Sequence, residues 1–328
     1  MAMPLPETRK ANVIEPLSMS LPVDLPCADG VRLSGNLWLA PEEVSGVVIV
    51  SGTTGIPASH YHAYARYLAL RGFETLTYDY RGIGRSRPHD LHGCDYRWDD
   101  WGTLDFEAAI QFMRKRHPKA KLKVVGHGTG GFIPGFAPSA RRIHRILAVG
   151  AHYSYWRDYP ANRRREMFLR WHVFMPFITF LLGYFPGRSL GWLEDLPRLI
   201  AYNWAFRRRD MEATHPRAHR AAIMNRFEQV TAPILAVVVA GDEFGTEPAV
   251  KRSLRRYWGS TKLIVHLTPT DLLSHAVDHL GLFEARLEHA FWGPSLLWLR
   301  DGCNPWPLNV IWRERAGGAA TSAIQPAR

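Results

Sequence analysis

The residues best suited to chemistry lie at positions 124–131, which spell VVGHGTGG. An apolar strand that runs into Gly-x-Ser-x-Gly and then a helix is typical of a nucleophile elbow, a strained turn that projects a serine hydroxyl. Gly126 and Gly130 occupy the flanking positions of this pattern, but the central residue is Gly128, which has no side chain. The sequence therefore predicts the scaffold of an elbow without its nucleophile, with a helix following Gly131.

An acid and a histidine follow farther along the chain. Asp242 comes just after the apolar run 234–240, and His279 comes after the last apolar run, 263–267. Histidine is the usual general base near neutral pH, so the chain order of elbow, acid and histidine matches that of acyl-transfer enzymes built on an elbow. Glu243 and His275 lie close to these two in the sequence and are the alternative acid and base.

Two further loops follow predicted strands. Residues 51–55 (SGTTG) come after the run 47–50, where acyl-transfer enzymes of this kind supply a backbone N–H group to the oxyanion hole. Residues 79–86 (DYRGIGRS) follow the next run, and we expect Asp79 and Arg81 to brace that loop. His127 is expected to pack beneath the elbow.

Short apolar runs alternate with helical patterns, which predicts a mostly parallel sheet with helices on both faces. Residues 61–68 and 101–112 have helical spacing, and Gly72 and Pro118 mark where these helices must have ended. Strands are predicted at 31–39, 47–50, 74–78, 122–125, 143–149, 234–240 and 263–267. Ligands of such sheets bind at the carboxyl ends of the strands, which is where the motifs above fall.

The alternation stops after Gly150 and resumes near Pro233, which indicates an insertion. The inserted segment is rich in aromatic residues, and residues 151–227 hold thirteen Arg and no Lys against six acids, so about +7 of the total charge of +11 lies there. Arginine clusters of this kind are usually solvated helix faces, and no nucleic-acid-binding motif accompanies them. We therefore expect no nucleic-acid partner.

The composition excludes several classes of protein. With 328 residues and 46% hydrophobic content, the chain can bury a large core and is not intrinsically disordered. The longest apolar stretch, 171–185, is too short for a membrane-spanning helix. Three scattered cysteines suit neither a disulfide framework nor a metal site, and without a secretory signal at the start we expect a cytoplasmic location. The tail from Ala316 is expected to be frayed.

Together these motifs resemble the α/β-hydrolase superfamily over about residues 25–299. The resemblance is to a bacterial branch of predicted serine hydrolases with an SG-T-G loop, a DYRGIGRS segment, a GHSxGG elbow, a cap containing GYFPGR (183–188 here) and a late histidine. It implies that Asp242 is the acid, that His279 is the base, and that the family's serine falls on Gly128. The oxyanion donors would be the N–H groups of Thr129 and of Thr53 or Thr54.

The resemblance also implies a division of the chain. The hydrolase core would span 25–150 and 231–300, the helical cap 151–230, the N-terminal extension 1–24 and the C-terminal tail 301–328. The cap would line an apolar acyl pocket, or alternatively rest on an anionic membrane surface. The residues expected to bind substrate are aromatic, namely Tyr153, Trp156, Phe174 and Phe177.

These expectations lead to two hypotheses. The first is a protein descended from an esterase or lipase-like hydrolase of hydrophobic esters, in which a water molecule activated by His279 acts in place of the missing serine. Thr129 is a poor substitute nucleophile because its side chain should point away from the elbow. The second is a pseudoenzyme that binds an acyl ligand without turnover. Neither requires a metal ion or an organic cofactor, and the oligomeric state stays open.

Overall fold

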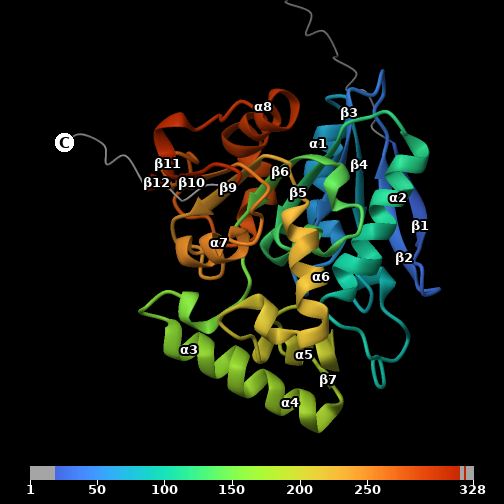
Figure 1. Cartoon of the computed structure of the whole chain (residues 1–328), viewed down its shortest axis with the longest axis vertical. Helices are drawn as coiled ribbons and strands as arrows, with labels where there is room; N and C mark the ends of the chain where they lie inside the picture. Colours follow the sequence, from blue (N-terminus) through green and yellow to red (C-terminus); the bar gives the residue numbers. More distant parts are fainter. Residues whose placement is uncertain (1–18, 318–320, 323–328) are drawn as a thin grey trace, which may run out of the picture.

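A computed structural model describes residues 19–317 and 321–322. Its centre is a ten-stranded sheet in the order β1-β2-β4-β3-β5-β6-β9-β10-β11-β12, in which the six strands from β4 to β10 run parallel (Figure 1). The strands are β1 (Ser20–Pro26), β2 (Arg32–Trp38), β3 (Gly46–Ser51), β4 (Phe73–Tyr78), β5 (Leu122–His127), β6 (Ile143–Val149), β9 (Ile234–Val239), β10 (Lys262–Leu267), β11 (Val310–Glu314) and β12 (Thr321–Ser322).

The central strands are apolar throughout because both faces of the sheet are covered. Every residue of β3, β4, β5 and β9 is buried. Successive side chains of a strand point to opposite faces, so Val47 and Ile49 of β3 join one hydrophobic cluster while Val48 and Val50 join another. The continuous apolar runs in the sequence thus reflect parallel strands buried on both sides.

Helices supply the two covering layers. Side chains of α1 and α8 belong to one cluster, and those of α2, α6 and α7 belong to the other. The helices are α1 (His62–Ala69), α2 (Glu107–Arg116), α3 (Arg164–Phe168), α4 (Met175–Leu182), α5 (Arg198–Ala205), α6 (Arg217–Glu228), α7 (Glu247–Leu254) and α8 (Gly293–Asp301).

The segment between β6 and β9 contains α3 to α6 and a small antiparallel pair, β7 (Tyr184–Phe185) with β8 (Leu196–Pro197). A π-helical stretch, Leu169–Phe174, joins α3 to α4, so that residues 164–182 form one rod. In Figure 1 this rod and α5 form a separate layer below the sheet. None of the described helices is both long and apolar enough to cross a membrane.

The predicted fold class and all seven predicted strands are confirmed, and three expectations need correction. β1 begins at Ser20, inside the predicted extension, because it pairs with β2, and β11 lies inside the predicted tail because it pairs with β10. Most of the tail expected to fray lies outside the described residues. The elbow is followed by the 3₁₀ turns Gly128–Gly131 and Ile133–Phe136 instead of the predicted helix. This segment contains several glycines and Pro134, and both residue types disfavour an α-helix.

Candidate active site

The turn after β5 has the backbone of an elbow. Gly128 has a φ of +55°, in the left-handed region that favours glycine. A Cβ atom on Gly126 would lie 2.5 Å from the carbonyl oxygen of Gly130, and one on Gly130 would overlap the carbonyl oxygen of Ser51. Gly126 therefore needs to be glycine so that the turn can fold back over the strand end, and Gly130 so that the turn can pack against the end of β3.

The place of the missing side chain is already filled. A Cβ atom on Gly128 would overlap Oγ1 of Thr53, and it would lie 2.7 Å from Cβ of Thr53 and 3.0 Å from Cε1 of His152. Both neighbours are themselves buried. Side chains of the loop after β3 and of the loop after β6 therefore occupy the position that a serine side chain would need.

His279 and Asp242 lie together because they follow neighbouring parallel strands, β10 and β9. Nδ1 of His279 is 2.8 Å from Oδ2 of Asp242, whose other oxygen accepts hydrogen bonds from the N–H groups of Phe244 and Gly245 at 2.8 Å each. Burial alone would raise the pKa of Asp242, but His279 and these N–H groups hold it below its ordinary value. Asp242 is thus an ionised group that can orient the imidazole.

The second ring nitrogen of His279, Nε2, is buried and has no hydrogen-bond partner among the described residues. The His279 ring centroid lies 4.5 Å from that of His127 and 5.0 Å from that of His152. His127 directly precedes Gly128 and His152 contacts the Gly128 position, so the ring stands beside the elbow. In this place Nε2 can accept a proton from a bound water molecule or hydroxyl group.

The two alternatives to this pair lie elsewhere. Glu243 forms an ion pair with Arg163 and has no contact with His279 in the described structure. His275 is exposed on the same loop as His279. The geometry thus brings together Asp242 and His279 and leaves both alternatives outside the pair.

His152 is a site residue that the sequence reasoning missed. It is 2% exposed, and its Nδ1–H group donates to the carbonyl oxygen of Gly150 at 3.1 Å. Burial lowers the pKa of His152 to about 3, so its ring is neutral. It follows β6, the parallel neighbour of β5, so the rule that ligands bind at strand ends could have singled it out.

His127 lies beneath the elbow, as predicted, and connects three loops. Its Nε2 is 2.8 Å from the carbonyl oxygen of His279, which can only accept, so Nε2 carries the proton. Nδ1 then accepts from the hydroxyl of Tyr61 at 2.8 Å, and Tyr61 in turn accepts from the N–H group of Thr53 at 3.0 Å. This chain fixes the loop of the base against the loop after β3.

The same contacts occupy two of the three predicted oxyanion donors, the N–H groups of Thr53 and Thr54. The N–H group of Thr53 is engaged by Tyr61, and that of Thr54 donates to Oγ1 of Thr129 at 3.0 Å. Oγ1 of Thr129 is also 3.0 Å from Oγ1 of Thr54. Neither N–H group of this loop is free to bind an oxyanion in this arrangement, and the Thr129 hydroxyl is held by the loop.

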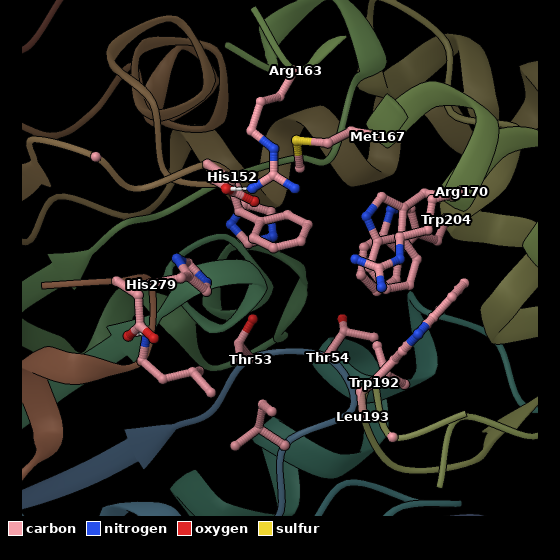
Figure 2. Close-up of a pocket in the computed structure, with 18 residues that line it drawn as sticks. Thr53, Thr54, His152, Arg163, Met167, Arg170, Trp192, Leu193, Trp204 and His279 are labelled. Atoms are coloured by element: carbon pink, nitrogen blue, oxygen red, sulfur yellow. Dashed lines mark hydrogen bonds and ion pairs between the residues drawn. The ribbon is translucent and has the colours of Figure 1, made fainter. Parts of the chain in front are cut away.

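A cavity of about 430 Å³ opens above this cluster (Figure 2). Thr53, Thr54, His152 and His279 contribute to its wall on the side of the sheet. The opposite wall comes mainly from the segment between β6 and β9. Its aromatic residues are Trp171, Trp192 and Trp204, and Phe244 joins them from the loop after β9.

The four aromatic residues predicted to bind substrate do not line this cavity. Tyr153 is buried and faces other cavities, and Trp156 packs against Phe168. Phe174 and Phe177 are 37% and 59% exposed on the outer side of the rod. Helical phase places Phe177, six residues after the inward-facing Trp171, on the outside of the rod. Phe174 instead packs against Trp192, with ring centroids 5.6 Å apart.

Charged groups stand at the edge of the cavity. Arg163 at the start of the rod forms an ion pair with Glu243 after β9, which joins the two walls (Figure 2). The guanidinium carbon of Arg170 lies 3.9 Å from the centre of the Trp192 ring. The cavity is therefore aromatic and cationic on the side away from the sheet.

One family of known sequences resembles part of this chain. A family model described as serine aminopeptidase, S33, matches residues 42–164. The matched part contains the loop after β3, the elbow and His152, and it ends before Asp242 and His279. It covers well under half of the chain.

Solved structures match over a larger part. An esterase of Pyrococcus furiosus is 15% identical, with a TM-score of 0.52 over 86% of this chain and 91% of that one. Est1E of Butyrivibrio proteoclasticus with bound ferulic acid is 16% identical, with a TM-score of 0.54 over 84% and 98%. DcsB in complex with its substrate analogue is 15% identical, with a TM-score of 0.56 over 87% and 100%. The chain has the α/β-hydrolase fold.

Proposed function

We propose that this protein hydrolyses a hydrophobic carboxylic ester slowly, with a water molecule from the adjacent cavity acting as the nucleophile instead of a serine. The observation that carries the proposal is the buried pair of Asp242 and His279, whose Nε2 atom has no hydrogen-bond partner among the described residues and stands beside the elbow. A general base held in this way, at the foot of an aromatic cavity, is suited to deprotonating water next to a bound ester.

The reaction needs only these groups and water. Nε2 of His279 takes a proton from the water as the water oxygen bonds to the acyl carbon. The resulting tetrahedral intermediate collapses when the bond to the alcohol oxygen breaks, and His279 returns its proton to that oxygen. The products are a carboxylic acid and an alcohol. Asp242 stabilises the imidazolium that forms between the two proton transfers.

The expected rate is low. Loss of a triad residue leaves roughly 10³ to 10⁴ of acceleration over water in serine hydrolases, contributed by the oxyanion hole and by binding. Here the engaged N–H groups of Thr53 and Thr54 reduce even that contribution. Activity should therefore exceed the buffer rate but stay far below that of an ordinary esterase.

The test is hydrolysis of a medium-chain nitrophenyl ester by the whole protein. We expect multiple turnovers above the buffer rate, loss of this activity in His279→Ala, and no change in His275→Ala. His275 is the matched control because it lies exposed on the same loop. Equal rates in the protein and in His279→Ala would contradict the proposal.

A second function, binding of an acyl ligand without turnover, is favoured by one observation. The Thr53 hydroxyl fills the nucleophile position, and the nearby N–H groups are engaged. This function predicts saturable binding of a fatty acid or acyl ester with no hydrolysis above buffer. Multiple turnover that depends on His279 would decide against it.

We also propose that the outer face of the rod rests on an anionic membrane surface. Large apolar residues along 169–182 are exposed, including Phe177 at 59% and Phe180 at 75%. Contiguous exposed apolar surface of this kind is typical of interaction sites. Residues 171–187 carry no Asp, Glu, Lys or Arg, whereas Arg165, Arg170 and Arg188 flank them, a charge pattern that complements anionic lipid.

A further inference from the structure

A second cavity, of about 270 Å³, shares no lining residue with the first. It is formed where residues 97–99 meet the end of α5 and the turn that precedes α6. Its lining is polar and basic, with Arg97, Arg207, His215 and His219 against a single acid, Asp99. No role in ester hydrolysis falls to this cavity.

Arg207 is the central residue of the cavity wall. It is 7% exposed, and among the described residues no carboxylate lies within ion-pair distance of its guanidinium group. Its Nε atom is fully buried without a hydrogen-bond partner in the described part of the chain. The guanidinium carbon lies 3.5 Å from the ring centre of Trp98 and 4.7 Å from that of Tyr153. Two aromatic rings therefore flank a buried cation that has no ion-pair partner in the part of the chain that the structure describes.

The ring contacts and the polar contact with the Tyr153 hydroxyl are a weak reason to bury such a charge. The effective cost of moving an ion out of water is several kcal/mol, whereas a desolvated cation–π contact contributes about 2 kcal/mol. Asp99 attracts Arg207 only weakly, from beyond ion-pair distance, and its Oδ2 atom lies 3.9 Å from Nδ1 of His215. The arrangement leaves room for an external anion to neutralise Arg207.

Other donors in the same wall also lack acceptors. The indole N–H of Trp98 is buried with no partner in the described structure. The side-chain oxygen of Asn203 accepts from the backbone N–H of Trp98 at 3.1 Å, so Asn203 has only its NH₂ group left to offer. Buried donors without acceptors are rare in folded proteins, and here two lie beside one cavity.

We propose that this cavity binds a small oxyanion, a carboxylate or a phosphate monoester, with Arg207 as its principal ligand and Arg97 and Asn203 as further donors. A planar guanidinium group matches the paired oxygens of either anion. The cavity is large enough for several waters at roughly 30 Å³ each, and hence for a group of this size. The site is independent of the hydrolysis proposed above.

The test is thermal unfolding of the whole protein with sodium phosphate or sodium acetate against sodium chloride at equal ionic strength. Ligand that binds only the folded state raises Tm, and we expect a rise of about 2 °C or more at saturation. A rise with one anion identifies the class that binds. No rise with either anion beyond that given by chloride would overturn the proposal.

Variants assign any effect to the residue. Arg207→Met keeps the length and ring contacts of the side chain without its charge, and it should weaken binding at least tenfold. Arg208→Met removes the same charge from an exposed neighbour and should leave binding unchanged. Arg207→Lys keeps the positive charge but removes the planar pair of donors, and it should weaken binding if Arg207→Met does not fold. Undiminished binding in Arg207→Met, or in Arg207→Lys if that is the variant that folds, refutes the assignment.

Discussion

The substitution Gly128→Ser would restore the nucleophile of the elbow, and the structure predicts that it fails on its own. A residue other than glycine in the left-handed region costs roughly 1–2 kcal/mol. The new Cβ atom would also overlap Oγ1 of Thr53 and lie 2.7 Å from Cβ of Thr53, and overpacking of this kind costs about 1–3 kcal/mol. Gly128→Ser should therefore lower the free energy of unfolding by about 2–5 kcal/mol.

The remedy follows from the contact that causes the strain. Combining Gly128→Ser with Thr53→Gly removes both Thr53 atoms and leaves the backbone of the loop in place. This double variant should recover the overpacking part of the loss, and its serine should have room beside Nε2 of His279. Combining Gly128→Ser with Thr54→Gly is the matched control, because Thr54 is not among the nearest atoms to the new Cβ.

Two assays measure these expectations. Urea unfolding gives the stability of each variant, and labelling by a fluorophosphonate probe reports a serine activated by a general base. We expect strong labelling of the Thr53→Gly combination and weak labelling of Gly128→Ser alone and of the control. If Gly128→Ser alone is as stable as the parent protein, a Cβ atom at position 128 does not overlap Thr53. If the Thr53→Gly combination folds but is not labelled, the pair of Asp242 and His279 is not poised over the elbow.

Two further predictions concern pH and membranes. Burial lowers the pKa of His152 to about 3, whereas a histidine in the unfolded chain titrates near 6.5. Below pH 6.5 the unfolded chain therefore binds a proton that the folded protein does not. As a result, the contribution of His152 to the free energy of unfolding falls by about 2 kcal/mol between pH 6.5 and pH 5. His152→Gln should lack this pH dependence. The difference in free energy of unfolding between the protein and this variant, measured by urea unfolding at pH 7 and pH 5, should therefore change by about 2 kcal/mol. A constant difference would show that His152 is not buried in its neutral form. Replacing Phe177 and Phe180 by Ser should weaken co-sedimentation with phosphatidylserine vesicles at least tenfold, whereas Leu308→Ser, at a residue 97% exposed on another part of the chain, should not. Equal sedimentation of all three proteins would rule out the outer face of the rod as the contact.

The sequence was sufficient to predict the strands because burial on both faces leaves continuous apolar runs such as 47–50 and 234–239. It was not sufficient for the edge of the sheet. β1 has only one fully buried residue and β11 has none, so neither gives an apolar run that marks a strand. Their pairing with β2 and β10 depends on contacts between segments, which a single sequence does not reveal.

The sequence could predict which strand ends carry residues of the candidate site. Asp242 and His279 could be paired because each follows a parallel strand, and their 2.8 Å contact agrees with that inference. The aromatic wall could not be predicted, because a rod rich in Phe and Trp on all sides does not show which face turns inward. Trp171 lines the cavity while Phe177, six residues later, is exposed.

The largest departure from expectation concerns the residues around Gly128. The sequence suggests a vacancy where the serine side chain is missing, yet close packing leaves few empty spaces in a protein interior. The Thr53 hydroxyl and the His152 ring occupy that place, and the hydrogen bond from the Thr53 N–H group to the Tyr61 hydroxyl fixes the adjacent backbone. The obstacle to a serine at position 128 therefore lies in the loop after β3 as well as in the missing nucleophile. For that reason serine-dependent activity should return fully only when positions 128 and 53 are changed together.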